Sequence, residues 1–280
     1  MMFPGAHPWI AWVILLPLAA AIAAVAFRRA AAWVGGLTAA GVVVGATGLV
    51  WQVARDGAQR HAVGGWGAPL GIDLRADGLG ALLVAMTAVI GLAVSLYALR
   101  YFSDADAEDD LAKQRHKRAY FWPLWLFLWA ALNALFLSAD VFNLYVTLEL
   151  LGFAAVALVA LDGQRAAVVA AMRYLLVSLL GSLCFLLGVA LLYATNATVD
   201  LALLAQSMKP GPPAWAALAL MTAGLLIKGA LFPVHFWLPP AHANAPAPVS
   251  ALLSALVVKA AFYILLRLWF EAFADVAAGA

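Results

Sequence analysis

Charge is the scarcest property of this sequence: only 11% of its 280 residues are charged, while 66% are apolar. Soluble domains average about a quarter charged residues. The net charge of +2 is too small to suggest nucleic acid as a partner. The single cysteine, Cys184, excludes an internal disulfide, and we interpret it as apolar filler in a helix. The apolar excess lies in long runs, which is typical of a membrane protein.

About eight of these runs are long enough to cross a bilayer, which takes roughly 20 apolar residues each. They are 8–27, 32–53, 77–100, 119–139, 140–161, 167–194, 214–232 and 249–270. Spanning segments must satisfy their own backbone hydrogen bonds, so all should be helices. The first is not a cleavable signal peptide, because no lysine or arginine precedes it. The sequence therefore predicts an all-α polytopic membrane protein.

The basic residues between these runs predict how the chain is oriented. The more basic side carries Arg28, Arg29, Arg100, Lys113, Arg115, Lys117, Arg118, Arg165 and Arg173; the other carries Arg55, Arg60, Arg75 and Lys209. Loops rich in lysine and arginine stay in the cytoplasm. We therefore expect the N-terminus outside and a charged cytoplasmic loop over 104–118.

Turn and cap signals complete the outer side. The glycine-rich segment 54–76 is typical of turns, with room for a small hairpin. Asp77 and Asp140 each open a span, where an aspartate usually caps the first turn. Gly41 and Gly45 form a G-x-x-x-G pair, which favours close helix packing.

Three ionisable residues lie where a membrane helix should be apolar: Glu149, Lys228 and Lys259. A charge at the bilayer centre costs at least ~2.5 kcal/mol, and such residues normally face the bundle interior. Snorkelling fails for Lys259, which lies about ten residues, or ~15 Å, from either end of its span. A static Glu–Lys pair would leave one lysine over. Arg173 and Arg267 lie nearer span ends, where snorkelling or a lipid headgroup contact suffices.

A buried lysine is suited to moving protons because its proton affinity depends on its surroundings. Desolvation disfavours the ammonium form, and a neighbouring carboxylate opposes that effect. Moving the carboxylate, or changing the water around the pair, would switch the lysine between capture and release. Glu149, Lys228 and Lys259 are therefore our candidate proton-translocation residues, as a relay with a gate.

The stretch after Lys228 is rich in proline and cannot continue a regular helix. Pro233, Pro239 and Pro240 predict a helix break at membrane depth, a recurrent device at transport sites. His235 and His242 lie within it and titrate near neutrality, so they could extend the relay. The alternative is that both histidines only pack at an interface. Haem ligation lacks a second set of histidines on facing helices.

At this point the sequence resembles a known family. The segments FPVHFWLPPAHANAPAPVSALLSALVVK, DVFNLYVTLELLGF and GIDLRADGLGALL are similar to motifs of the proton-translocating antiporter-like subunits. That family includes the L, M and N membrane subunits of complex I, the A-type and D-type subunits of Mrp cation/proton antiporters, and membrane-bound hydrogenase relatives. The resemblance covers nearly the whole chain, which matches the N-terminal portion of the family.

The resemblance assigns roles to the ionisable residues. Glu149 resembles the glutamate of the fifth helix and Lys228 the lysine of the seventh, a pair thought to gate one half-channel. Lys259 resembles the eighth-helix lysine, which links that half-channel to a central hydrophilic axis. His235 and His242 match histidines often found in the broken segment.

The resemblance also divides the chain. Residues 1–103 would be helices 1–3, 104–118 the charged loop, 119–270 helices 4–8 forming a first inverted repeat, and 271–280 a tail. Family members usually have about fourteen helices in which two inverted repeats of five occur. The second repeat is absent here, so the chain would be a fragment, a split gene product, or completed by another chain.

The resemblance implies a proton- or cation/proton-translocating subunit of a larger complex in a bacterial inner membrane. That complex is either a redox-driven pump of the NADH-quinone oxidoreductase type or an Mrp-type antiporter, and the sequence is slightly closer to the D-type branch. We expect no cofactor, no metal and no redox chemistry in this chain. Expected partners are lipid, other membrane subunits, protons and Na+. The alternative is a structural subunit without transport, or an incomplete fragment.

Overall fold

The computed structural model describes residues 8–103 and 108–278, which are almost wholly helical. The longer helices are α1 (Pro8–Ala26), α2 (Ala31–Asp56), α3 (Gly78–Tyr101), α4 (Glu108–Phe136), α5 (Val141–Val159), α6 (Arg165–Asn196), α8 (Pro212–Lys228) and α11 (Val258–Arg267). The shorter ones are α7 (Leu201–Ser207), α9 (Leu238–Asn244), α10 (Ala247–Leu252) and α12 (Ala274–Ala278). Single turns of 3-10 helix are η1 (Arg28–Ala30), η2 (Val63–Gly65) and η3 (Ala160–Asp162); π-helical turns are η4 (Leu253–Val257) and η5 (Leu268–Ala272).

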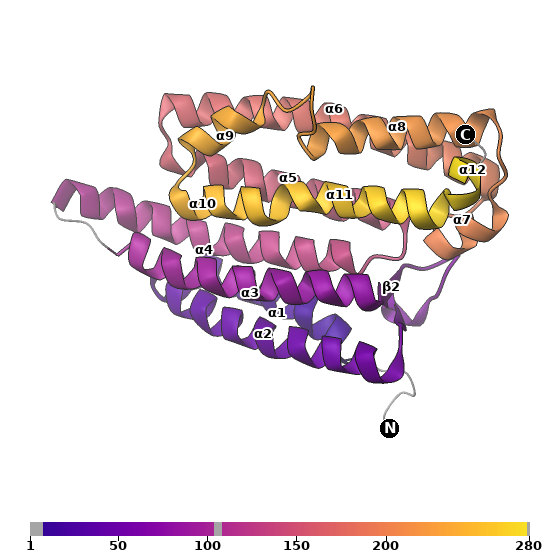
Figure 1. The fold of residues 1–280 in the computed structure, drawn as a ribbon. Coiled ribbons are helices and arrows are strands. Elements are labelled where there is room, and N and C mark those ends of the chain that lie inside the picture. Colours follow the sequence, from indigo (N-terminus) through magenta and orange to yellow (C-terminus); the bar gives the residue numbers. More distant parts are fainter. Residues whose placement is uncertain (1–7, 104–107, 279–280) are drawn as a thin grey trace.

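The long helices run along one common direction in two layers (Figure 1). One layer holds α1 to α4, and the other holds α5, α6, α8 and the continuous α10–α11 rod. Helix α4 packs against both α1 and α5, so it joins the layers. Three tryptophans of α4, Trp122, Trp125 and Trp129, are fully buried there. This arrangement confirms the predicted all-α fold.

Seven helical segments in the described residues are long and apolar enough to span a membrane. They are Pro8–Ala26, Arg28–Asp56, Gly78–Tyr101, Lys117–Phe136, Val141–Asp162, Arg165–Asn196 and Ala247–Ala272. The remaining predicted span, 214–232, corresponds to α8, which stops after 17 residues at Lys228. The chain resumes as helix only at Leu238. The seventh predicted helix is therefore broken, as its prolines indicate.

The predicted hairpin is present at one end of the bundle. Strands β1 (Gln59–Ala62) and β2 (Asp73–Ala76) pair antiparallel, with Gln59 opposite Ala76. The predicted aspartate caps are also confirmed: Asp77 accepts from the backbone N–H of Gly80 at 2.9 Å, and Asp140 from that of Asn143 at 2.6 Å.

Two predicted boundaries differ from the structure. The segment 104–118, predicted as a loop, is helical from Glu108 onward as the start of α4, while 104–107 lie outside the described residues. Leu111, Ala112 and Lys113 are strong helix formers and favour this extension. The predicted tail from 271 continues as the end of η5 and then α12.

Small residues let neighbouring helices approach closely. A Cβ on Gly41 would lie 2.8 Å from Leu16 of α1, so the G-x-x-x-G face of α2 packs as predicted. Helices α6 and α8 meet at two glycines: a Cβ on Gly181 would lie 2.8 Å from the carbonyl oxygen of Gly224, and a Cβ on Gly224 would overlap the backbone of Gly181. This contact sets the distance between α6 and α8, the helix that ends at Lys228.

Candidate proton-translocation site

Helix α8 ends at Lys228, in the interior of the bundle. Ala230, two residues on, has a φ of 51°, a left-handed conformation that does not continue a right-handed helix. The carbonyl of Ile227 accepts hydrogen bonds from the N–H of Ala230 at 3.2 Å and from the indole of Trp237 at 3.0 Å. The C-terminal end of a helix carries partial negative charge, which favours an ammonium group there. The break therefore creates a place where a buried lysine is electrostatically supported.

Lys228 forms an ion pair with Glu149 from the middle of α5. Its Nζ lies 2.6 Å from a carboxylate oxygen, and the two side chains are only 5% and 14% exposed. A buried charge needs such a partner, because leaving one partner alone is strongly destabilising. The structure thus brings together two of the three predicted midplane charges.

Helix α6 supplies two serines that contact this pair. Lys228 Nζ donates to Ser178 Oγ at 3.0 Å, and Ser182 Oγ lies within hydrogen-bonding distance of the Glu149 carboxylate. Ser182 Oγ also lies 2.9 Å from the carbonyl oxygen of Ser178. A hydroxyl has one proton, so Ser182 donates to only one of these acceptors at a time. The Ser182 hydroxyl can donate to the Glu149 carboxylate when Glu149 is ionised, and to the Ser178 carbonyl when Glu149 is protonated.

A small cavity adjoins the pair and reaches toward α11. Its volume of about 10 Å³ corresponds to space for about one water molecule. Gly152 and Ser178 line one side, and Val257 and Ala261 the other. Tyr174, also lining it, stacks on Trp237 with ring centroids 4.2 Å apart. The broken segment therefore packs directly against the walls of the site.

Lys259 lies elsewhere than predicted. It follows the π-helical turn η4, and its Nζ donates to the backbone carbonyl of Ser254 within that turn. The side chain is exposed on the outer face of the α10–α11 rod, along with Ser254 and Phe262. The expectation that all three midplane charges face the interior of the bundle is wrong for this lysine. It faces outward because the helix face that packs on the bundle is apolar, through residues such as Leu256 and Ala260.

The two histidines of the broken segment do not contact the Glu149–Lys228 pair. His242, on α9, lies 2.8 Å from Ser250 Oγ and within electrostatic reach of Lys259. His235 is exposed and near the ring of Phe232. Pro233 lies in the non-helical break, whereas Pro239 and Pro240 belong to the first turn of α9. Proline fits a first helical turn, where its missing N–H is not needed, so these two restart the helix.

An ion-pair cluster at the hairpin end replaces the predicted snorkelling of Arg267. Arg267 is 9% exposed and contacts Asp77 and, at 3.3 Å, Glu271. Arg75 of β2 contacts the same two acids, with Nη2 2.7 Å from Glu271 Oε2. The cluster ties the last span to the hairpin and to the start of α3. These two carboxylates neutralise the Arg267 guanidinium within the protein, so its side chain does not need to extend to the membrane surface.

The charges at this end shift the pKa values of the loop groups. Burial alone would raise the pKa of Asp77, but hydrogen bonds from Arg267 and from Gly80 outweigh it and lower that pKa. The hydrogen bond to Glu271 raises the pKa of Arg75. Asp140 shows the opposite balance, because burial raises its pKa and the nearby charge of Asp200 adds to the effect.

Residues 138–278 match the family described as "NADH:quinone oxidoreductase/Mrp antiporter, TM". The chain belongs to this family. The match begins just before α5 and therefore includes Glu149, both serines, Lys228 and Lys259. With its apolar helices, membership makes the chain an integral membrane protein.

Curated relatives come from both branches of the family. The chain is 36% identical to the N subunit of the NADH-quinone oxidoreductase of Desulforudis audaxviator, over 91% of its own length and 51% of the relative's. It is 35% identical to the D subunit of the Na(+)/H(+) antiporter of Bacillus subtilis, over 83% of its own length and 45% of the relative's. The chain thus spans about half the length of these relatives, and the identities do not separate the branches.

Solved structures show the same fold. The chain superposes on the Mrp complex from Dietzia sp. with a TM-score of 0.84 and 28% identity, covering 96% of this chain and 50% of that one. An archaeal membrane-bound sulfane sulfur reductase gives the same TM-score and identity, at 93% and 53% coverage. Respiratory complex I from Thermus thermophilus, at 23% identity and a TM-score of 0.70, agrees in fold.

Sequence reasoning missed the serines. Ser178 and Ser182 are four residues apart on α6, so they share a helix face that is otherwise apolar. That spacing was the available signal. Among the described residues, no group of three or more His, Cys, Asp or Glu side chains is placed to hold a metal ion.

Proposed function

We propose that this chain moves protons, or protons together with a cation such as Na+, across a membrane as one subunit of a larger complex. The observation that supports this best is the buried Glu149–Lys228 pair at the end of a broken helix. Buried charges are costly in membranes and mark ion pathways. The relatives named above, an oxidoreductase subunit and an antiporter subunit, agree with this function.

The pair could hold one proton in two ways. With Glu149 ionised and Lys228 charged, the 2.6 Å contact and the two serines stabilise both charges. Passing the proton from Nζ to the carboxylate neutralises both groups and lets Ser182 turn to the Ser178 carbonyl. The two arrangements differ by small side-chain movements. Water in the adjoining cavity would then donate a proton to neutral Lys228 in one step and accept one from the charged lysine in another.

We propose Lys259, His235 and His242 as an extension of this path toward a neighbouring subunit, although among the described residues they contact groups other than the ion pair. The cavity beside Lys228 ends at Val257 and Ala261, on the rod that also carries Lys259. His242 on α9 lies 2.8 Å from Ser250 Oγ on α10, the first part of the same rod. Lys259, exposed in this chain, would need a covering neighbour, because a lysine facing lipid at mid-membrane is costly. That neighbour would be another membrane subunit or a further repeat, with 119–270 forming the first.

The arrangement of basic residues supports the predicted orientation. Arg28, Arg29, Arg100 and Arg165 lie at the bundle end that holds η1 and α9, while Arg60 and Arg75 lie at the hairpin end. By the positive-inside rule the hairpin end, where α1 begins, would face outward from a bacterial inner membrane. The driving force would be a redox enzyme in one branch of the family or a cation gradient in the other. In both cases this chain would carry ions without redox chemistry of its own.

The decisive test is proton flux in membrane vesicles containing the assembled complex. Glu149→Gln and Lys228→Ala should abolish most of the flux while the protein still inserts and assembles. Lys117→Ala is a matched control, because it breaks an ion pair of equal 2.6 Å length with Asp162 at a membrane end. Wild-type flux in both pair variants would contradict the proposal and favour a structural subunit or an inactive fragment.

The branch can be assigned from the proteins that co-purify with the chain in mild detergent. Iron–sulfur and flavin subunits would place it in a redox-driven pump. Small membrane subunits alone, together with Na+-dependent flux, would place it in a cation/proton antiporter.

A further inference from the structure

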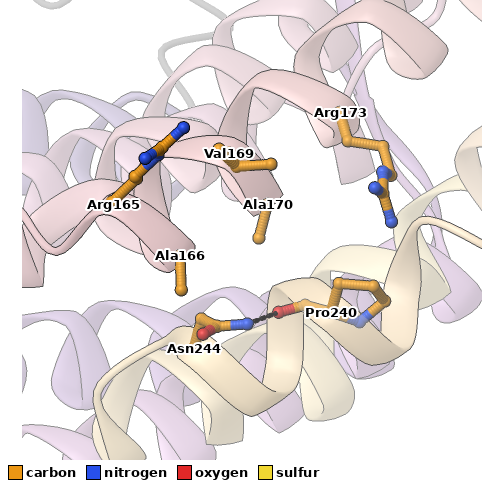
Figure 2. Close-up of a pocket in the computed structure, with 7 residues that line it drawn as sticks. All are labelled: Arg165, Ala166, Val169, Ala170, Arg173, Pro240 and Asn244. Atoms are coloured by element: carbon orange, nitrogen blue, oxygen red, sulfur yellow. Dashed lines mark hydrogen bonds between the residues drawn. The ribbon is translucent and has the colours of Figure 1, made fainter.

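A cavity of about 530 Å³ lies between the N-terminal part of α6 and the restarted helix α9. Its α6 wall is formed by Arg165, Val169, Ala170 and Arg173, among others, and its α9 wall by Pro240 and Asn244 (Figure 2). Figure 2 shows Arg173 extending toward Pro240 and Arg165 pointing away from α9. This volume is within the range of pockets that hold small organic ligands.

The cavity is positively charged and has no counterion among the described residues. Neither Arg165 nor Arg173 has a carboxylate within ion-pairing distance there, and Asp162, the acid nearest in sequence, is paired with Lys117 at 2.6 Å. Asn244 is uncharged, and its amide donates to the carbonyl of Pro240 at 2.8 Å, so it cannot act as the counterion. Two guanidinium groups at one cavity call for an anion, which they bind best as a phosphate or carboxylate.

The depth of Arg173 in the membrane narrows the choice of anion. Helix α6 has 32 residues, more than the roughly 20 that cross the hydrocarbon. Tyr193, 60% exposed near the far end, suits the opposite interface, and Arg173 lies 20 residues before it. Arg173 therefore lies at the edge of the hydrocarbon, and Arg165 about 12 Å further out. The headgroup layer of one leaflet is roughly 5–8 Å thick, so Arg173 lies at the level of the lipid phosphates and Arg165 at the outer edge of the headgroups.

An apolar stripe continues from the arginines along the same helix face. Steps of three and four residues lead from Arg165 through Val169 and Arg173 to Leu176, Leu180, Leu183 and Leu187. Each of these four leucines is more than half exposed. Residues at this spacing form one continuous line on a helix. The face thus offers two cations at headgroup level and a hydrocarbon track below them.

We infer that this cavity is a binding site for an anionic glycerophospholipid, whose phosphodiester contacts Arg173, whose headgroup extends toward Arg165 and whose acyl chain lies along the leucine stripe. Charge complementarity favours this occupant over a zwitterionic lipid, and the leucine stripe favours it over a free phosphate. The site shares no residue with the Glu149–Lys228 pair, so the inference does not depend on the proposed transport. Because α9 forms one wall, a bound lipid would also brace the broken helix against α6.

Native mass spectrometry of the detergent-purified full chain tests this directly. Phosphatidylglycerol and phosphatidylcholine with identical acyl chains are titrated in parallel, against the wild type and the Arg165→Gln/Arg173→Gln double variant. We expect about tenfold or greater loss of phosphatidylglycerol affinity in the double variant, because the charged hydrogen bonds to the lipid headgroup are removed. Phosphatidylcholine binding should be weak in both proteins. Arg165→Lys/Arg173→Lys should retain most of the preference for the anionic lipid.

The matched control is Arg28→Gln/Arg29→Gln, which removes two exposed arginines from the same end of the bundle. It should leave phosphatidylglycerol binding unchanged. An equal loss in this control would show general charge attraction and overturn the proposed site. Displacement of the lipid by millimolar inorganic phosphate would assign the cavity to a soluble anion instead, and equal binding of the two lipids would also overturn the inference.

Discussion

The ammonium of Lys228 lies 2.6 Å from the carboxylate of Glu149, although the two residues are 79 positions apart in the chain. Helix α6 passes between their helices, packing closely on α8 and on α5. Its two serines contact one charge each, Ser178 the ammonium and Ser182 the carboxylate. The pair is therefore positioned by three helices, and the uncharged contacts from α6 decide how each charge is solvated.

Replacing the serines should shift the pH dependence of proton flux in opposite directions. Ser182→Ala removes a donor from the Glu149 carboxylate, which favours the protonated acid and should move the profile toward alkaline pH. Ser178→Ala removes an acceptor from the Lys228 ammonium, which favours the neutral amine and should move the profile toward acid pH. Each lost hydrogen bond to a charged group corresponds to about a tenfold change in flux on the steep limb of the profile.

The measurement is flux against pH in vesicles, with Ser95→Ala as control. Ser95 is a buried helix serine that accepts from the indole of Trp125 at 3.0 Å, away from the pair. Its replacement should change stability without moving the profile. If both serine variants lower the flux without shifting its pH profile, the two serines only pack against the pair and do not tune its charges.

Asp77→Asn should destabilise the protein, because Asp77 is a charged partner of Arg267 and Arg75. Asparagine can still cap α3, so the variant removes mainly the charge. The pKa of Asp77 is lowered in the folded protein, so its contribution is complete above the unfolded value of about 3.9 and is lost as pH falls through the lower folded pKa. We expect a loss of about 1–3 kcal/mol that is equal at pH 7 and pH 5.

Thermal unfolding at several pH values checks this, with Asp56→Asn as control. Asp56 pairs with Arg55, but their side chains are 41% and 64% exposed, so that exchange should have little effect. An Asp77→Asn protein as stable as the wild type at pH 7 would show that the cluster contributes nothing net.

Asp140→Asn should have the opposite effect. Burial and the neighbouring Asp200 raise the pKa of Asp140, so its ionisation at neutral pH lowers the stability of the folded protein. Asparagine would keep the cap on Asn143 and remove the charge. The wild type gains stability as pH falls from above the folded pKa toward the unfolded value. The variant should therefore unfold at higher temperature at pH 7, with an advantage of about 1 kcal/mol that disappears in acid. A lower unfolding temperature at pH 7 would contradict this.

Local signals predicted what depends on neighbours in sequence. Proline frequency located the break after Lys228, and the aspartates before two spans were recognisable as caps, because both effects act within one turn. Glu149 and Lys228 could be identified from the sequence because a charged residue within a long apolar run is unusual in itself. Their pairing came from the family resemblance.

Long-range partners could not be predicted from the sequence. Arg267 lies 190 positions from Asp77, so hydropathy alone suggested snorkelling where the structure has an ion pair. The outward direction of Lys259 depends on which face of α11 packs, and the π-helical turn before it changes that direction by inserting a residue into the helix. The spacing of Ser178 and Ser182 shows that they share a helix face, but only the position of α6 beside both charged helices assigns them to the pair.

Gly224→Ala should move Lys228 away from its contact on α6 without altering any charged residue. Gly224 is one turn before Lys228, and a Cβ there would overlap the backbone of Gly181 on α6. Rigid backbone cannot yield as a side chain can, so α8 must move away and carry Lys228 from Ser178, now 3.0 Å distant. Flux should fall toward the level of Lys228→Ala. Gly36→Ala is the control, since its Cβ would meet only Leu99 at 3.9 Å. Normal flux in an assembled Gly224→Ala protein would mean that the α6–α8 distance does not control the pair, and that Glu149 alone positions the lysine.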